Sequence, residues 1–163
     1  MTDGQDWAQW MQRHGPALLL YARQIVHDPA LAEDAVQEGF VRFWLHRRKA
    51  PEPLGLLYAA VRSAALDSMR RRQRRNPREQ AVARPEACFD VAAAQRESSA
   101  DVEAALAQLP VEQREVVVLK IWGGLTFTQI AQAIGESVGT SASRYRYAMQ
   151  KLATLLRAEV PLE

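Results

Sequence analysis

Residues 126–147 read TFTQIAQAIGESVGTSASRYRY and contain the clearest helix boundaries of the sequence. Thr126 and Gln129 stand at the spacing of a capping box, which predicts the start of a short helix. Gly135 follows, and we expect the helix to end there because glycine adopts a positive φ at little cost. Ser137 then suits the N-cap of a last, longer helix. Two helices joined in this way form a helix-turn-helix, a motif that places its second helix in the DNA major groove.

The two helices of this motif are expected over residues 127–134 and 138–156. Ala131 supplies the small residue that is needed where the helices touch. In the second helix, steps of three and four predict a buried stripe of Val138, Tyr145, Ala148, Leu152 and Leu155. The side chains predicted to meet DNA are Thr126, Thr140, Ser143, Arg144, Arg146 and Tyr147. The alternative is a plain helical hairpin whose outward arginines are only solvated.

The N-terminal part also has helical spacing, because apolar residues recur every three or four positions and no stretch alternates as a strand does. We expect two helices at the start, the first marked by Trp7 and Trp10 and the second covering residues 18–26. A third helix is expected over residues 29–46, with Asp28 as its N-cap.

Residues 47–53 contain Pro51 and Pro53 and do not readily continue a helix, so a loop is expected there. A fourth helix is predicted over residues 54–72, with one buried side made of Leu54, Tyr58, Val61, Ala65 and Met69. Between residues 73 and 98 the periodicity dissolves, which indicates a linker; a short helix with an apolar face is the alternative.

Helical periodicity returns at Ser99, and Pro110 is placed to open the next helix. We therefore expect an all-α protein of two small helical domains joined by a flexible linker, with the helix-turn-helix in the C-terminal domain. The expected bounds are 1–75 for the first domain, 76–98 for the linker and 99–160 for the second domain.

The predicted helix over residues 29–46 has a polar side as well as an apolar one. Its buried side is expected to consist of Ala32, Ala35, Val36, Phe40, Phe43 and Trp44. The exposed side then carries Asp34, Gln37, Glu38, Val41 and Arg42, which together offer a surface for a partner protein. The alternative is an ordinary solvated face with an ion pair between Glu38 and Arg42.

Positive charge is concentrated in the loop and the helix that follow. The basic residues are Arg47, Arg48 and Lys49 in the loop, and Arg62, Arg70, Arg71, Arg72, Arg74 and Arg75 in and after the fourth helix. Such a concentration attracts a phosphate backbone and makes binding strongly dependent on salt. The alternative is a cationic helix end that is favoured by the helix dipole.

The composition further restricts the class of protein and its place in the cell. The net charge of the 163 residues is only +2, so positive charge acts locally and not as a global excess. Cys88 is the single cysteine and cannot form an internal disulfide. No apolar run approaches the roughly 20 residues that span a bilayer, and the N-terminus lacks the pattern of a signal peptide. We therefore expect a cytoplasmic protein without membrane insertion.

Three blocks of this sequence, in this order, resemble the extracytoplasmic-function (ECF) sigma factors of bacterial RNA polymerase. Residues 32–44, AEDAVQEGFVRFW, resemble the second conserved region of that family, and residues 57–71, LYAAVRSAALDSMRR, resemble the helix after it. Three further segments resemble the fourth conserved region of the family: AQLPVEQREVVVL at 107–119, GLTFTQIA at 124–131 and GTSASR at 139–144. The resemblance covers nearly the whole chain apart from the linker and the termini.

This resemblance implies a protein that is not an enzyme, needs no cofactor or metal, and binds core RNA polymerase and promoter DNA. It implies that Asp34, Gln37, Glu38 and Arg42 grip the clamp of the polymerase's largest subunit. Residues 47–72, with Arg62 and Ser63 among them, would face the minus-ten element, hold a flipped base and support strand opening. The helix-turn-helix would bind the minus-thirty-five element, and an anti-sigma factor is a further implied partner.

The sequence departs from the family at four of these positions. Ser141 stands where a buried valine is usual, Ala142 where a basic residue is common, and Tyr147 where an arginine is frequent. Ser63 stands where asparagine is often found. The bases that each surface reads are therefore left open.

Two other functions compete with this interpretation. A stand-alone helix-turn-helix regulator would bind duplex DNA without polymerase, but it leaves the stripe from Asp34 to Arg42 unexplained. A metal-dependent enzyme would use carboxylates such as Glu33 and Glu38 with His27, but these residues lack the helical spacing that such metal sites require.

Overall fold

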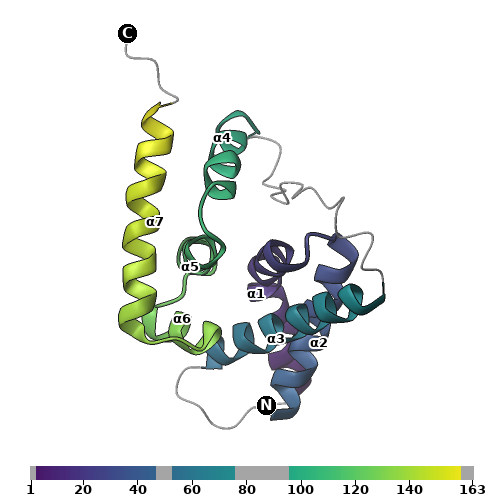
Figure 1. Ribbon diagram of the computed structural model, residues 1–163. Helices are drawn as coiled ribbons and strands as arrows, with labels where there is room; N and C mark the ends of the chain where they lie inside the picture. Colours follow the sequence, from purple (N-terminus) through teal and green to yellow (C-terminus); the bar gives the residue numbers. More distant parts are fainter. Residues whose placement is uncertain (1–2, 47–52, 76–95, 159–163) are drawn as a thin grey trace.

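The computed structural model describes residues 3–46, 53–75 and 96–158. Every regular element in these ranges is an α-helix, which confirms the all-α prediction. In chain order the helices are α1 (Asp3–Val26), α2 (Pro29–His46), α3 (Pro53–Arg75), α4 (Arg96–Ala107), α5 (Val111–Ile121), α6 (Phe127–Ile134) and α7 (Val138–Ala158) (Figure 1). Most of the predicted linker and of the predicted loop lies outside the described residues.

The first helix corrects the prediction of two separate helices before residue 27. Asp3–Val26 is one continuous helix with Pro16 inside it. The N-terminal half is held by aromatic contacts with α2, since the ring centroids of Trp7 lie 5.1 Å from Phe40 and 5.2 Å from Trp44. Aromatic packing of this kind offsets the roughly 3 kcal/mol that an interior proline costs a helix.

The second helix begins and packs as the sequence predicts. Asp28 Oδ1 accepts hydrogen bonds from the amides of Ala30, at 2.9 Å, and Leu31, at 3.3 Å, which confirms it as the N-cap. The predicted apolar side is buried, apart from Trp44, which is half-buried. At Gly39 the helix comes so close to α3 that a Cβ atom would lie 2.6 Å from Val61 Cα. Glycine is therefore required for this helix contact.

The helix-turn-helix is confirmed in each of its local signals. Thr126 Oγ1 accepts from the amide of Gln129 at 3.2 Å, and Gln129 Oε1 accepts from the amide of Thr126 at 2.8 Å. Gly135 ends α6 with a φ of 72°, in the left-handed region. Ser137 Oγ accepts from the amide of Thr140 at 3.0 Å and so caps α7.

The buried stripe of α7 differs from the predicted one at its start. Val138 is 47% exposed, whereas Ser141, which was not assigned to the stripe, is fully buried. The hydroxyl of Ser141 donates to the carbonyl oxygen of Ser137 at 3.0 Å, so its burial leaves no polar group unpaired. The stripe continues through Ala148 and Leu152 as predicted.

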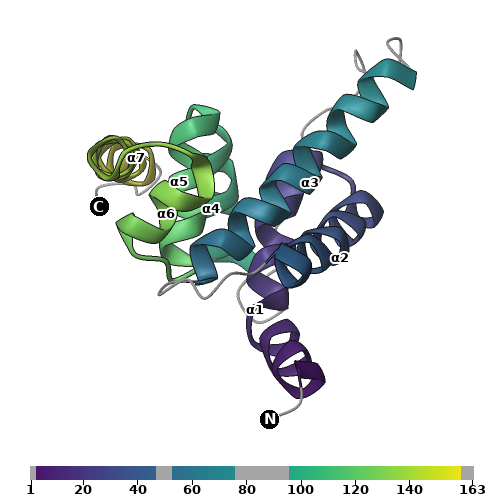
Figure 2. The same ribbon diagram turned by 90° about the horizontal axis from the view of Figure 1, so that it is seen from below.

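The N-terminal and C-terminal helices pack against each other, which the sequence analysis did not predict. One hydrophobic core joins buried residues of α1, α2 and α3 to residues of α5 and α6, among them Val116, Leu119 and Ile130. α6 lies against the N-terminal half of α3 (Figures 1 and 2). A Cβ atom on Gly55 of α3 would lie 2.9 Å from the carbonyl oxygen of Gln129, so the two helices touch backbone to backbone.

A smaller core holds the C-terminal helices together. It joins α4, α5 and α7 through Ala105, Leu106, Leu109, Val117, Ala148 and Leu152. α5 therefore contributes to both cores, since Val117 faces one and its neighbours face the other. Among the described helices, none is both long enough and apolar enough to cross a membrane.

Candidate functional site

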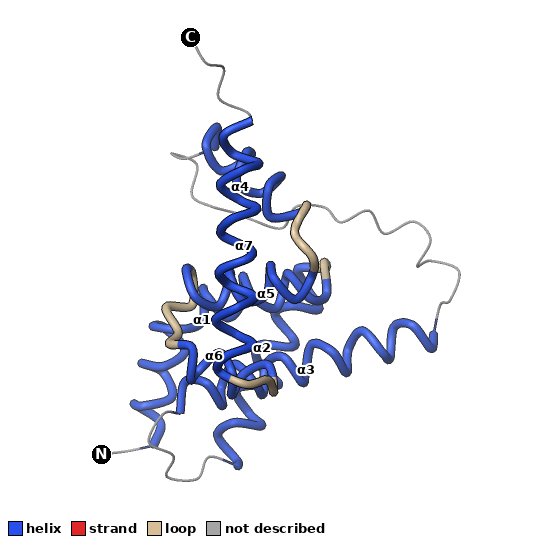
Figure 3. The backbone as a smooth tube through the Cα atoms, turned by 60° about the vertical axis from the view of Figure 1, so that its left-hand side comes forward, coloured by secondary structure: helices blue, strands red, loops and turns tan. Residues whose placement is uncertain are grey.

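The C-terminal half of α3 projects beyond the body of the protein and carries the arginine run (Figures 2 and 3). The side chains of Arg70, Arg71 and Arg72 are 67%, 56% and 50% exposed. Arg74 and Arg75 are exposed at the end of the helix. The helix therefore presents five guanidinium groups to solvent within two turns, as the sequence predicts for a surface that binds phosphates.

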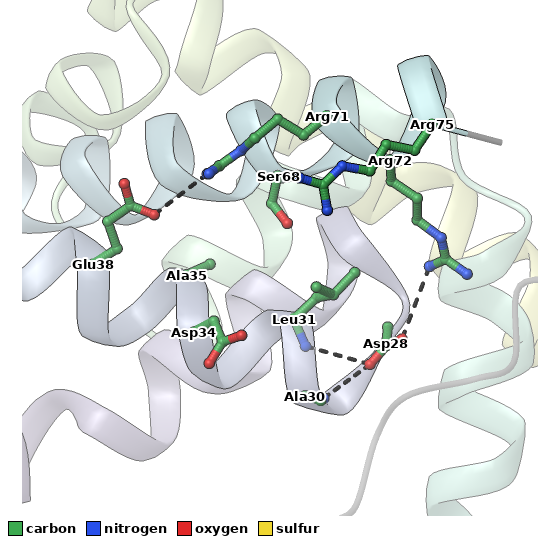
Figure 4. Close-up of a pocket in the computed structure, with 10 residues that line it drawn as sticks. All are labelled: Asp28, Ala30, Leu31, Asp34, Ala35, Glu38, Ser68, Arg71, Arg72 and Arg75. Carbon is green, nitrogen blue, oxygen red and sulfur yellow. Dashed lines mark hydrogen bonds and ion pairs between the residues drawn. The ribbon is translucent and has the colours of Figure 1, made fainter. Parts of the chain in front are cut away.

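Each of the first three arginines has a carboxylate nearby, but at long distance. Arg70 lies 3.6 Å from Asp67 on its own helix. Arg71 lies 3.6 Å from Glu38 and Arg72 lies 3.9 Å from Asp28, both across the gap to the second helix and its cap (Figure 4). Exposed pairs of this kind contribute about 0 to 1 kcal/mol. A phosphate can therefore replace these carboxylates at little cost.

A hollow of about 530 Å³ lies between the second and third helices (Figure 4). Its two walls carry opposite charge. The acidic wall has Asp28, Asp34 and Glu38, and the basic wall has Arg71, Arg72 and Arg75. The predicted polymerase-binding stripe and the predicted DNA-binding arginines therefore meet in one place, although they were predicted as separate surfaces.

Arg42 is the centre of an ion-pair network that joins α2 to α3. Its guanidinium lies 2.6 Å from Glu38 Oε1 and 3.0 Å from Asp67 Oδ2, and it donates to Ser63 Oγ at 3.4 Å. The hydrogen bond to Glu38 is the main cause that raises the pKa of Arg42. The ion pair between Glu38 and Arg42, which belonged to the alternative interpretation of this helix side as an ordinary solvated face, is therefore present. The same network also reaches α3 through Asp67 and Ser63.

The exposed side of α2 consists of both polar and apolar residues. Asp34 and Gln37 are exposed, as predicted. Val41 continues the same line and is 49% exposed, and Leu45 one turn further is 74% exposed. Leu45 was not among the residues predicted for this surface, although its spacing of four from Val41 places it on this side. Apolar side chains exposed beside polar ones are typical of a protein-binding surface.

Arg62, in contrast, does not lie on the open surface with the other arginines. Its Nε atom donates to Glu115 Oε1 at 2.6 Å, and the hydroxyl of Tyr21 donates to the same oxygen at 2.5 Å. Glu115 belongs to α5, so this cluster joins the C-terminal helices to α1 and α3. The side chains of Arg62 and Glu115 are 31% and 13% exposed.

The electrostatics of this cluster fix its protonation. Burial raises the pKa of Tyr21 well above its ordinary value, and the charge of Glu115 raises it further. Burial acts to lower the pKa of Arg62, but the hydrogen bond and the charge of Glu115 outweigh it and raise that pKa. Tyr21 therefore stays a hydroxyl donor and Arg62 stays a cation at any physiological pH.

Sequence reasoning missed Glu115, yet a signal for it was present. The run Val116 to Leu119 is apolar at four consecutive positions, all of them buried in the structure, and consecutive residues point to different sides of a helix. A helix buried all round must have neighbours on more than one side. That pattern indicates a second packing partner for α5, and Glu115 lies beside it.

The residues predicted to read duplex DNA lie along the start of α6 and the N-terminal half of α7. Arg146 and Tyr147 are exposed, and the guanidinium of Arg146 lies 5.3 Å from the centre of the Tyr147 ring. Arg144 pairs with Glu136 at 3.4 Å. Thr140 and Ser143 are half-buried, and Thr126 is exposed at the cap of α6.

Three of the predicted DNA-binding residues, Arg47, Arg48 and Lys49, lie outside the described residues. In the part of the chain that the structure describes, no group of three or more His, Cys, Asp or Glu side chains is arranged to hold a metal ion.

The chain has the two parts of a sigma-70-type subunit of RNA polymerase. The family model described as "Sigma-70 region 2" matches residues 10–75, and the one described as "Sigma-70, region 4" matches residues 99–152. The chain is 33% identical over 157 residues to "ECF RNA polymerase sigma factor SigL" of Mycobacterium tuberculosis, which covers 88% of this chain and 85% of that one. It therefore belongs to the ECF sigma factors of RNA polymerase, which are DNA-binding proteins of transcription initiation and not enzymes.

Other relatives agree with this membership. "RNA polymerase sigma-E factor" of Streptomyces coelicolor is 29% identical, over 93% of this chain and 86% of that one. The sigma factor RpoE of Bartonella quintana, solved with the anti-sigma factor NepR, has the same fold at a TM-score of 0.74 and 24% identity, over 95% of this chain and 99% of that one. CnrH, solved with the cytosolic domain of CnrY, matches with a TM-score of 0.64 and 27% identity. The match covers 97% of this chain and 92% of the CnrH chain.

The family membership decides between the interpretations that the sequence left open. A stand-alone regulator is not supported, because region 2 accompanies the helix-turn-helix of region 4. A metal-dependent enzyme is not supported either, because the sigma family is not enzymatic.

Proposed function

We propose that this sigma factor holds the minus-ten element of the promoter with α3 and its neighbourhood, and reads the minus-thirty-five element as duplex with α7. The observation that carries this proposal is the exposed arginine run at the projecting end of α3. Its ion pairs are long and weak, so the guanidinium groups are available to phosphates. The residues proposed for the minus-ten side are Arg47, Arg48, Lys49, Arg62, Ser63, Arg70, Arg71 and Arg72.

Strand opening gives the arginines a physical task. A base taken out of the stack costs a few kcal/mol, which a base pocket and contacts to the strand backbone have to offset. A projecting helix with arginines on several sides can follow a single strand over several nucleotides. We therefore place the opened strand along the C-terminal half of α3, with Ser63 and Arg62 toward its start.

The duplex-reading surface is proposed on the helix-turn-helix. The exposed pair Arg146 and Tyr147 offers a cation and an aromatic edge, and Arg144 is positioned by Glu136 to meet the backbone. Thr126, Thr140 and Ser143 complete the set, because hydroxyl groups at helix N-termini commonly bind phosphate oxygens.

The polymerase-binding surface is proposed on α2. Asp34 and Gln37 are exposed and would contact the clamp directly, together with the apolar Val41. Glu38 and Arg42 belong to the same proposed surface, but their ion pairs indicate that they mainly fix α2 against α3. Leu45, 74% exposed, extends the surface by one turn.

The organisation of the chain follows from these assignments. We propose that residues 1–75 act on polymerase and the minus-ten element, that residues 99–160 act on the minus-thirty-five element, and that residues 76–98 connect them through the polymerase channel. The protein would work in the cytoplasm, where core polymerase is found. Because two solved relatives are bound to anti-sigma factors or such a domain, we also propose an anti-sigma partner that covers the α2 surface.

Run-off transcription with core polymerase tests the proposal. Arg70, Arg71 and Arg72 changed together to Ala should abolish open complexes and leave polymerase binding intact, because the change removes phosphate contacts and, toward the α2 side, only the long and weak ion pairs with Glu38 and Asp28. A matched control removes three exposed cations elsewhere, Arg13, Lys151 and Arg157. Open complexes at the wild-type level in the first variant would show that the arginine run is wrongly assigned.

A further inference from the structure

Hydrogen-bond donors gather on the basic wall of the hollow between α2 and α3. Ser68 and Arg75 line it, and neither side chain has a hydrogen-bond or ion-pair partner among the described residues. Arg71 and Arg72 line the same wall and reach only distant carboxylates, at 3.6 and 3.9 Å (Figure 4). Three guanidinium groups and one hydroxyl therefore border a common space, and together they can donate several hydrogen bonds to one anion.

This set of donors fits a phosphate group. A guanidinium presents two parallel N–H groups that match two oxygens of a phosphate, and the hydroxyl of Ser68 can donate to a third oxygen. Ala30, Leu31 and Ala35 add apolar side chains to the lining. The volume of about 530 Å³ is in the range of sites for small molecules, so a phosphate fits together with its sugar.

Asp28 faces this basic wall with a carboxylate that is held in place. Its Oδ1 atom accepts hydrogen bonds from the amides of Ala30 and Leu31, at 2.9 and 3.3 Å, which fixes the side chain as the cap of α2. Its Oδ2 atom lies 3.9 Å from Nη1 of Arg72. This distance is too long for a hydrogen bond, so Arg72 keeps its N–H groups for a closer acceptor. Carboxylate and phosphate are alternative anions for the same guanidinium.

We propose that the hollow binds one phosphate of the opened promoter strand, and that Asp28 takes the place of this phosphate at Arg72 while the strand is absent. The inference rests on the proposed function, because its ligand is the strand that is placed along α3. A single strand suits a hollow between two helices, since a duplex bends smoothly only over many base pairs. Ser68 and Arg75 then bind the strand directly, and Asp28 sets its affinity.

Asp28 sets the affinity because a phosphate has to displace it from Arg72. An exposed ion pair of this length changes an affinity by up to about fivefold, and the pair of Arg71 with Glu38 adds a second contribution of the same kind. The protein therefore binds a strand more weakly than its number of arginines implies. Dissolved salt weakens these internal pairs as well as the contacts to phosphate, so the affinity also falls less steeply with salt.

Asp28→Asn tests this role, because asparagine caps a helix as well as aspartate does but carries no charge. The full-length protein is titrated into a labelled single strand of random sequence, and fluorescence anisotropy gives the affinity at several salt concentrations. We expect binding about two- to fivefold tighter than that of the wild type, with a steeper fall in salt. Glu33→Gln is the matched control, since Glu33 is exposed on α2 and does not line the hollow. Equal affinities of the two variants would overturn the role of Asp28.

A double-mutant cycle shows whether Asp28 acts through Arg72. Arg72→Ala removes the guanidinium that Asp28 faces, so the gain from Asp28→Asn should largely disappear in that background. A gain of the same size in both backgrounds would reduce Asp28 to one negative charge among others and overturn the proposal. Inorganic phosphate, compared with chloride at equal ionic strength, should not displace the strand, because it replaces only one of the strand's contacts. Displacement by inorganic phosphate would mean that the hollow binds a free anion, and would overturn the strand as its ligand.

Ser68→Ala tests the basic wall of the hollow. Loss of the hydroxyl should weaken strand binding about two- to tenfold without lowering Tm, because alanine favours a helix more than serine does. An unchanged affinity would contradict the phosphate site.

The proposed function is tested separately by the variant that carries Arg70→Ala, Arg71→Ala and Arg72→Ala. If this variant opens promoters as the wild type does, the proposed function fails. If it opens none while Asp28→Asn binds the strand no more tightly than Glu33→Gln does, only the phosphate site fails. The two failures are therefore distinguishable.

Discussion

Replacing Gly39 by Ala should destabilise the protein by about 2 kcal/mol, although alanine normally stabilises a helix by about 1 kcal/mol relative to glycine. An added Cβ would lie 2.5 Å from Val61 Cγ2, 2.6 Å from Val61 Cα and 2.8 Å from Val61 N. Two of these three atoms are backbone atoms, which no change of rotamer can move. α2 and α3 would therefore have to separate by about 1 Å to restore an ordinary carbon contact of about 3.5 to 4.0 Å.

The expected loss in free energy of unfolding follows from this separation of the two helices. Overpacking a well-filled core costs about 1 to 3 kcal/mol, and we take the upper end because backbone opposes the new methyl group. Subtracting about 1 kcal/mol of helix propensity leaves about 2 kcal/mol, or a fall in Tm of about 4 to 8 °C for a chain of this size. The buried neighbours that would loosen are Phe40, Val61 and Ala64.

Urea denaturation followed by circular dichroism measures this free energy. The matched control is Gly139→Ala in α7, where an added Cβ would meet only Ser137 Oγ, at 4.0 Å, so a gain of about 0.5 to 1 kcal/mol is expected there. The two identical substitutions should shift the stability in opposite directions. A Gly39→Ala protein at least as stable as wild type would refute the reasoning about the helix contact.

Three further predictions concern stability, polymerase binding and DNA binding. Burial and then the charge of Arg114 lower the pKa of His27, so protonation of this side chain is disfavoured in the folded protein. The contribution of neutral His27 to the free energy of unfolding is therefore fully present above the ordinary pKa of 6.5 and is lost as the pH falls below it. Because His27 also has a φ of 53°, His27→Asn should raise Tm slightly and weaken the acid dependence, which unfolding at neutral and mildly acidic pH measures; an unchanged acid dependence would contradict this role. Leu45→Asp should weaken binding to core polymerase about tenfold or more without lowering Tm, as a pull-down and a melting curve would show; unchanged binding would remove Leu45 from the surface. Arg146→Ala should weaken binding to a minus-thirty-five duplex and reduce the slope of log affinity against log salt by about 1, whereas an unchanged slope would mean that Arg146 touches no phosphate.

The local signals of the fold could be predicted from the sequence because each depends on a few adjacent residues. The cap at Asp28, the capping box at Thr126 and the left-handed turn at Gly135 are all determined by side chains within one turn of the helix end. The start and end of α2 were predicted for the same reason. A proline alone did not mark a helix end, because tertiary packing of Trp7 and its neighbours holds α1 together across Pro16.

The contact between the two regions could not be predicted because it depends on residues far apart in the chain. Glu115 lies 53 positions from Arg62 and 94 from Tyr21, and no local spacing connects them. Arg62 was grouped with the other arginines by charge, whereas the structure separates it from them by burial. Val138 was assigned to the buried stripe by its spacing, but it is 47% exposed, and Ser141 takes the inner position.

One carboxylate connects the proposed polymerase-binding surface of this sigma factor with its proposed DNA-binding surface. Glu38 binds Arg42 through one oxygen and faces Arg71 through the other. A protein that takes hold of Glu38 removes a negative charge from the field around Arg71, and the end of α3 then attracts a phosphate strand more strongly. Docking on core enzyme would in this way prepare the helix for DNA without any movement of its backbone.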